Sequence, residues 1–204
     1  MSDKAVARIT RKLNREFRHN RLALFDEMNV VGIRKHIQKL YKKSYQIIKN
    51  EFVAILGPLY DEIYEYAVSL GFKGTPEELD ENWIERYFQE YNPTTKQVFK
   101  NEIDRKRSYL LEAVVADPET EFESYAKAER LLNNQVKQCG IDLEDAVARS
   151  VYKDLGVKKV RWIAEDDYKT CDICNELDNQ VFDIDDAPPK QHRNCRCYLI
   201  PVRD

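Results

Sequence analysis

The sequence has little of several features that mark particular protein classes. No segment reaches the roughly 18 uninterrupted apolar residues of a membrane-spanning helix, and the first residues lack the apolar core of a secretory signal. Only 6 of 204 residues are glycine and 7 are proline, which excludes collagen-like and low-complexity chains. With 43% hydrophobic residues, including 12 Tyr and 8 Phe, the chain can build a core. We expect a globular protein, made in a cytosol-like compartment, without a membrane partner.

The signatures of several enzyme classes are missing as well. The sequence contains no glycine-rich phosphate loop, no His-Glu-x-x-His helix and no His-x-Glu upstream of a Pro-Cys-x-x-Cys pair. A catalytic zinc also needs an open coordination position and a general acid or base nearby, and no motif supplies them. We therefore expect no enzymatic activity and no small-molecule substrate, with a metal-dependent hydrolase as the alternative.

Charge is unevenly distributed along the chain. The formal net charge is −3, but residues 1–50 carry 13 Lys or Arg against 4 Asp or Glu, whereas residues 51–94 carry 2 against 10. Such a basic segment can meet nucleic acid, an acidic protein surface or the acidic second quarter of its own chain. The simpler interpretation is that the basic residues form a solvent-exposed helix face and pair with the acidic residues of the same chain.

Apolar positions at helical spacing predict a mostly helical body over residues 1–156. The first stripe comprises Val6, Ile9, Leu13 and Phe17. Helix ends are expected at Gly57-Pro58, Gly71, Asn92-Pro93, Gly140 and Gly156. Helix starts are expected at two capping-box patterns, residues 75–78 and 94–97, and at Asp117-Pro118 and Asp142.

After Gly156 the pattern changes to short strands. Residues 157–164, 181–182 and 195–202 are rich in β-branched and aromatic side chains, and turn-forming residues fill 165–180 and 183–194. The sequence therefore predicts an α+β fold, in which a helical body (1–156) precedes a small strand-and-loop unit (157–204).

Five potential metal ligands lie within this unit. They form the pattern Cys171-x-x-Cys174, then His192-x-x-Cys195-x-Cys197. Zinc takes four thiolate or imidazole ligands in a tetrahedron, and a Cys-x-x-Cys turn directs two sulfurs to one point. We predict a structural zinc site, with one donor to spare.

Other interpretations of these cysteines stay open. If the chain is extended from Cys195, then Cys195 and Cys197 share a face, so either can be the fourth ligand. The cysteines can also be reduced, buried packing residues. A redox dithiol is a third interpretation, although no thioredoxin-like βαβ pattern surrounds Cys171. Cys139 lies apart near a predicted helix end, and we expect it to serve packing.

The C-terminal unit resembles the domain of the Mu F-like phage minor head proteins, also called head morphogenesis proteins. The resemblance covers about 40 residues and is carried by an ordered series of motifs: Val160-Arg161-Trp162-Ile163-Ala164 with Asp167, Cys171-Asp172-Ile173-Cys174, Leu177-Asp178-Asn179-Gln180-Val181-Phe182, Pro188-Pro189 and His192-Arg193-Asn194-Cys195-Arg196-Cys197. The family usually has glycine at the position of Asn179. A turn that needs positive φ tolerates asparagine best after glycine, so we expect the turn to survive.

The resemblance implies a minor capsid protein that acts in head morphogenesis. It implies contact with the phage portal protein and the inner capsid, a place in the virion after assembly in the bacterial host cytoplasm, and a role in DNA packaging or ejection. Some relatives carry an additional toxin or enzyme domain after the motif; none follows it in this sequence, so we expect no such activity. The alternative function is a zinc-stapled protein that binds packaged phage DNA through residues 1–50.

Overall fold

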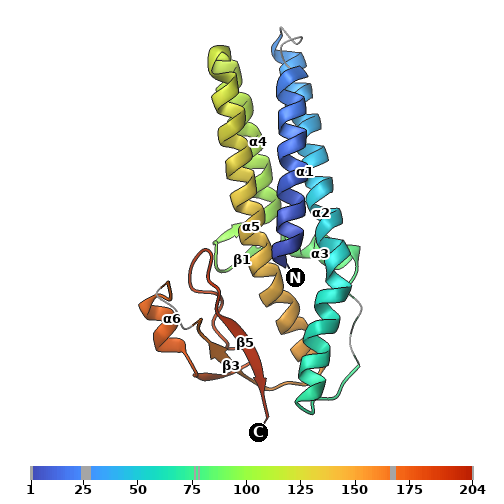
Figure 1. Cartoon of the computed structure of the whole chain (residues 1–204), viewed down its shortest axis with the longest axis vertical. Helices are drawn as coiled ribbons and strands as arrows, with labels where there is room; N and C mark the ends of the chain where they lie inside the picture. Colours follow the sequence, from blue (N-terminus) through green and yellow to red (C-terminus); the bar gives the residue numbers. More distant parts are fainter. Residues whose placement is uncertain (1, 24–28, 76, 78, 166–168, 204) are drawn as a thin grey trace.

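The computed structural model describes residues 2–23, 29–75, 77, 79–165 and 169–203. Long helices form one elongated bundle, and a small sheet lies beside the C-terminal half of the last long helix (Figure 1). The predicted α+β arrangement, a helical body followed by a strand-and-loop unit, is confirmed. No helix in the described part of the chain is long and apolar enough to cross a membrane.

Four helices build the bundle and alternate in direction along it (Figure 1). They are α1 (Ser2–Ala23), α2 (Val30–Ser69), α4 (Phe99–Ala116) and α5 (Glu121–Asp154). The core between α1, α2 and α5 is aromatic. The ring of Phe17 makes edge contacts with Tyr41 and Tyr125, at centroid distances of 5.9 and 6.3 Å. Such pairs favour a defined packing geometry in addition to the burial of apolar area.

Helix α1 follows the predicted apolar stripe. The side chains of Ile9 and Leu13 are fully buried and that of Phe17 is 1% exposed, while Val6 packs at the edge of the core. Because the stripe repeats every three or four residues, one face of α1 meets α2 and α5 and the other meets solvent.

Helix α2 runs through Gly57-Pro58, so the predicted break there is wrong. Pro58 cannot donate to the carbonyl of Ala54, and proline costs about 3 kcal/mol in a helix interior. However, Ala54, Gly57 and Pro58 all lie on the exposed side, where water can reach the free carbonyl. Leu56 and Leu59 on either side are buried, and their burial holds the helix together.

Helix α5 likewise continues through Gly140, so the predicted end at Gly140 and the predicted cap at Asp142 are wrong. Among the residues that the structure describes, the Asp142 carboxylate caps no backbone amide; it accepts hydrogen bonds from the side chains of Gln138 (2.9 Å) and Asn92 (3.0 Å). A helical glycine costs only about 1 kcal/mol relative to alanine, which the buried apolar side chains along α5 outweigh.

The other predicted helix boundaries had mixed outcomes. Gly71 and Gly156, with φ of 91° and 69°, follow α2 and α5 as expected. Asp117 caps a 3₁₀ turn (Pro118–Thr120) that leads into α5. Helix α3 (Glu81–Gln89), however, begins after Asp80, whose side chain accepts from the Trp83 amide at 2.8 Å. The capping box predicted at 75–78 is therefore wrong as the start of this helix, and its residues 76 and 78 lie outside the described residues.

A short hairpin replaces the second predicted capping box, at residues 94–97. Strand β1 (Tyr91–Asn92) pairs antiparallel with β2 (Gln97–Val98), and α4 starts only at Phe99. The Asn92 side chain accepts from the Thr95 backbone N–H at 2.8 Å, an asparagine turn that competes with a helical start. The hairpin lies against the middle of α5 (Figure 1).

The C-terminal unit contains a three-stranded antiparallel sheet. Its strands are β3 (Lys159–Ile163), β4 (Val181–Asp183) and β5 (Tyr198–Val202), in the order β4-β3-β5. Side chains alternate between the two faces, so Val160, Trp162 and Leu199 are buried. The three predicted strands are present, but β5 begins three residues later than predicted. Part of the predicted turn at 165–180 is the short helix α6 (Asp172–Leu177).

The C-terminal unit is fastened to α5 by polar contacts. The Tyr152 hydroxyl donates to the carbonyl of Leu199 at 3.2 Å. The Arg149 guanidinium donates to the carbonyls of Ala187 (3.1 Å) and Pro188 (2.7 Å). The loop that leads to the predicted histidine ligand is thus held by a helix of the bundle.

Candidate metal centre

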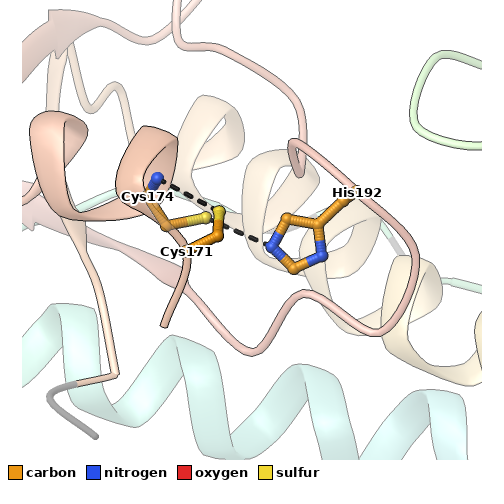
Figure 2. Close-up of side chains that lie close together, drawn as sticks. All are labelled: Cys171, Cys174 and His192. Carbon is orange, nitrogen blue, oxygen red and sulfur yellow. Dashed lines mark hydrogen bonds between the residues drawn. The ribbon is translucent and has the colours of Figure 1, made fainter. Parts of the chain in front are cut away.

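Helix α6 brings the first two predicted ligands together. Cys171 is its N-cap, and the Cys171 sulfur accepts from the Cys174 backbone N–H at 3.5 Å. Residues three apart at a helix start face the same side, so both thiols point to one place (Figure 2). Cys174 is only 1% exposed, while Cys171 is partly exposed.

His192 reaches this place from the loop after β4. Its Nε2 lies 3.5 Å from the Cys174 sulfur (Figure 2). Its Nδ1 lies 2.9 Å from the carbonyl oxygen of Arg193. A carbonyl can only accept, so a neutral His192 ring would carry its proton on Nδ1 and turn the Nε2 lone pair toward Cys174. This is the tautomer and orientation that a metal-binding histidine needs.

Cys195 and Cys197 complete the cluster from the segment before β5. Both are buried, at 0% and 3% exposure, while Arg196 between them is exposed. Cys195 and Cys197 therefore point to the same side, as predicted, although strand β5 begins only at Tyr198. The Cys195 sulfur lies 3.7 Å from the Cys174 sulfur.

The five donors form two overlapping groups that share Cys174. One group is Cys171, Cys174 and His192; the other is Cys174, Cys195 and Cys197; in each group the donor atoms lie within 4.8 Å of one another. All five predicted ligands thus lie close together. The choice of four among them, and the nature of the ion, stay predictions.

The distances fit a tetrahedral zinc ion. With Zn–S distances of about 2.3 Å and Zn–N distances of about 2.0–2.1 Å, two sulfurs lie about 3.8 Å apart and a sulfur and a nitrogen about 3.5 Å apart. The distances from the Cys174 sulfur are 3.7 Å to the Cys195 sulfur and 3.5 Å to Nε2 of His192. These two separations are those of a tetrahedral zinc site, and the donors of each group of three lie within 4.8 Å of one another.

Burial favours the protonated form of the Cys174 and Cys197 thiols. Desolvation raises the pKa of Cys174 far above its usual value, and the neighbouring thiols raise it further. Burial likewise raises the pKa of the Cys197 thiol. A divalent cation reverses this preference because it stabilises the thiolate directly.

Sequence spacing did not predict the residues that support the cluster. Lys190, 6% exposed, donates from its ammonium group to the backbone carbonyls of Cys195, at 3.3 Å, and Cys197. Gln138 of α5, 2% exposed, accepts from the Asn194 backbone N–H at 2.8 Å. Because Lys190 and Gln138 contact the backbone, their side chains carry no ligand signature in the sequence.

Other predictions for this region are also tested by the structure. Asn179 has a φ of 61°, which confirms the predicted turn with positive φ. Cys139 is buried in α5, 5% exposed, and belongs to neither donor group among the described residues. Burial raises the pKa of its thiol, in keeping with the predicted packing role. Asp167, part of the family resemblance, lies outside the described residues.

Comparison with known families gives one match. The model of the family described as phage Mu protein F like protein matches residues 90–200, more than half of the chain. The match extends well before the 40-residue resemblance and includes β1, α4 and α5. No curated protein and no solved structure matches.

Proposed function

The chain belongs to the phage Mu protein F like family of phage head morphogenesis proteins, and on this premise we propose that it is a minor capsid protein docked at the portal vertex inside the head. The family match carries this proposal. In this role the helical bundle binds the portal protein and inner capsid through its surface, and the protein contributes to DNA packaging or ejection. Family membership indicates a virion component.

We further propose that the protein works by contact and performs no catalysis. The family is structural rather than enzymatic. A catalytic zinc keeps one position for water, whereas here four other protein donors lie around Cys174. Donors from the protein can fill every position of a tetrahedral ion, which supports a structural role.

The proposed zinc is held by four of Cys171, Cys174, His192, Cys195 and Cys197. When bound, such an ion supplies folding free energy, on the order of 10 kcal/mol in small zinc domains. The described residues of the proposed C-terminal unit, 157–165 and 169–203, form a three-stranded sheet and one short helix. A unit of this size needs such a contribution to stay folded.

Replacement of one ligand tests the zinc proposal. We expect Cys174→Ser to lose the metal and to disorder residues 157–203 while helical circular dichroism stays largely intact, because the bundle has its own core. Cys139→Ala is the matched control and should keep about one zinc per chain, since Cys139 lies outside both donor groups. Metal analysis and amide NMR spectra measure both effects. The proposal would be refuted if the purified wild-type protein contained no metal and its fold did not change when a chelator was added.

Co-expression with the portal protein of the same phage tests the docking proposal. Size-exclusion chromatography with light scattering should give one complex of fixed stoichiometry. This complex should persist at high salt if apolar surfaces dominate the contact. Separate elution of the two proteins at all salt concentrations would contradict docking on the portal.

DNA binding by residues 1–50 is the second candidate function, supported by exposed cations on α1. Arg11, Arg15 and Arg18 are exposed, and the structure gives them no ion pair among the described residues. Part of the basic charge is balanced internally, since both Arg8 and Lys12 pair with Glu51. Phosphate binding predicts an affinity that falls steeply with salt, with a logarithmic slope near one per neutralised phosphate. A flat salt response would exclude this function.

A further inference from the structure

A pocket lies between α5, the β1–β2 hairpin and the loop that precedes His192. Its volume is about 310 Å³, at the lower end of the range for ligand sites. Its walls are largely apolar and are lined by the rings of Tyr87, Tyr91 and Phe99 and by Pro93 and Pro189. Tyr91 is 63% exposed.

The charged groups of the pocket are mostly acidic. Glu90, Asp142 and Asp145 line it, with Arg149 as the one cation among its lining residues. Arg149 is already engaged by Asp145 at 2.8 Å and by two carbonyls of the loop. Among the described residues, no ammonium or guanidinium group lies within 4 Å of the carboxylates of Glu90 or Asp142. Glu90 therefore has no ion-pair partner in the described part of the chain, and the cation that acts on Asp142 is Lys190, which lies beyond 4 Å and donates to the carbonyls of Cys195 and Cys197.

Asp142 is held as a hydrogen-bond acceptor on both oxygens. Gln138 and Asn92 each donate an amide N–H to it. Neither amide can turn round, because the oxygen of Gln138 accepts from Asn194 and the oxygen of Asn92 accepts from Thr95. A carboxylate has about four acceptor positions, so Asp142 keeps capacity for a further donor.

Burial makes this carboxylate expensive to keep charged. Asp142 is 6% exposed, and desolvation raises its pKa to about 6. A cation that entered the pocket would stabilise the charged form, and it would do so in a weakly solvated place where an ion pair is strong.

We propose that this pocket receives the side chain of an arginine or lysine from a partner protein. The proposal rests on the proposed docking function and names the chemistry of one contact in it. The apolar walls suit the hydrocarbon stem of such a side chain, the tyrosine rings suit its cationic head, and Asp142 and Glu90 supply the opposite charge.

The pocket is also coupled to the metal centre. One wall comes from Ala187 and Pro189, and Arg149 anchors their loop to α5. Gln138 links Asp142 to Asn194, which lies between His192 and Cys195. The Cys/His cluster therefore fixes the loop that forms one side of the pocket, which gives that cluster a role in recognition.

An NMR titration of the full zinc-loaded chain tests this proposal. The probe is a blocked five-residue peptide with arginine at its centre, and the control peptide has citrulline, which keeps the shape but lacks the charge. We expect saturable shifts of the backbone amides of Ala146 and Ala187, and about tenfold weaker binding of the citrulline peptide, because a charge-assisted bond is lost.

Variants separate the pocket from the rest of the surface. Asp142→Asn should weaken the arginine peptide about tenfold. Because Asp142→Asn also disturbs two hydrogen bonds, Glu90→Gln serves as a second variant. We expect Glu90→Gln to weaken binding of the arginine peptide several-fold. Glu62→Gln, on the exposed side of α2, is the matched control and should bind as the wild type does.

Three results would overturn the proposal: equal binding of the two peptides, no saturable shift at tens of millimolar probe, or binding of free ethylguanidinium without binding of the peptide. The last would mean that the pocket takes a small cation rather than a partner side chain. The titration contains no portal or capsid protein, so its failure leaves docking on the portal untouched. A failed portal co-elution, conversely, does not affect the titration.

Discussion

Replacement of Gln138 by alanine is the sharpest test of how the C-terminal unit is joined to the bundle. Gln138 is 2% exposed and makes two hydrogen bonds, one from its oxygen to the Asn194 N–H and one from its amide to Asp142. The change leaves the Asn194 N–H without its acceptor and removes one of the two donors to Asp142.

The expected loss of stability follows from these two groups. A buried polar group left without a partner costs about 1–3 kcal/mol. Asn194 is exposed, so water can partly replace the lost acceptor of its backbone N–H, whereas Asp142 is buried. We therefore expect Gln138→Ala to lower the free energy of unfolding by about 2–4 kcal/mol. That is a large share of the 5–15 kcal/mol that a typical domain has.

Urea unfolding followed by circular dichroism and tryptophan fluorescence measures this loss. Gln46→Ala is the control, because Gln46 is also a helical glutamine but is exposed and bonds only to Asn50. Its effect should stay within about 0.5 kcal/mol. If Gln138→Ala costs no more than Gln46→Ala, the link between α5 and the Cys/His loop contributes nothing and the reasoning fails.

Three further predictions concern α2 and α5. Pro58→Ala should raise the free energy of unfolding by up to about 3 kcal/mol, because it restores a helical donor at an exposed site; a thermal melt that shows no gain would contradict this. The raised pKa of Asp142 means that the folded state holds its proton more tightly than the unfolded state. The wild type should therefore lose about 3 kcal/mol relative to Asp142→Asn between pH 4 and 7, measured as the difference between paired urea curves; a constant difference would refute the shift. Arg149→Lys should cost about 1–2 kcal/mol, since lysine cannot serve Asp145 and two carbonyls together. Arg107→Lys, at an exposed pair, is its control, and equal effects of the two changes would count against the anchoring role.

Much of the fold could be predicted because periodicity reports burial directly. The stripe of α1 and the three C-terminal strands follow from patterns that local residues carry. The wrong helix ends at Pro58 and Gly140 have a common cause. A glycine or proline destabilises a helix locally by about 1–3 kcal/mol. The burial that outweighs this cost depends on residues of other helices, far away in the sequence. The sequence around the breaker contains no measure of that burial.

The candidate site divides in the same way. The proximity of the five donors could be predicted because their spacing in the sequence is typical of metal ligands, and the turn at Asn179 because positive φ restricts the residue type. The supporting roles of Lys190 and Gln138 could not be predicted, because many polar side chains can form a hydrogen bond to a backbone carbonyl or amide. Which backbone group each one contacts depends on the folded structure. The pocket around Asp142 was beyond prediction for that reason too.

Helix α5 has a mechanical consequence. Its 34 residues make an unbroken rod about 51 Å long, packed at one end in the bundle and fastened near the other to the sheet and the Cys/His loop (Figure 1). A rod of that length turns a tilt of about 5° at its base into a displacement of about 4 Å at its tip. Whatever holds the end that carries the Cys/His cluster therefore also sets the direction of the far end of the bundle.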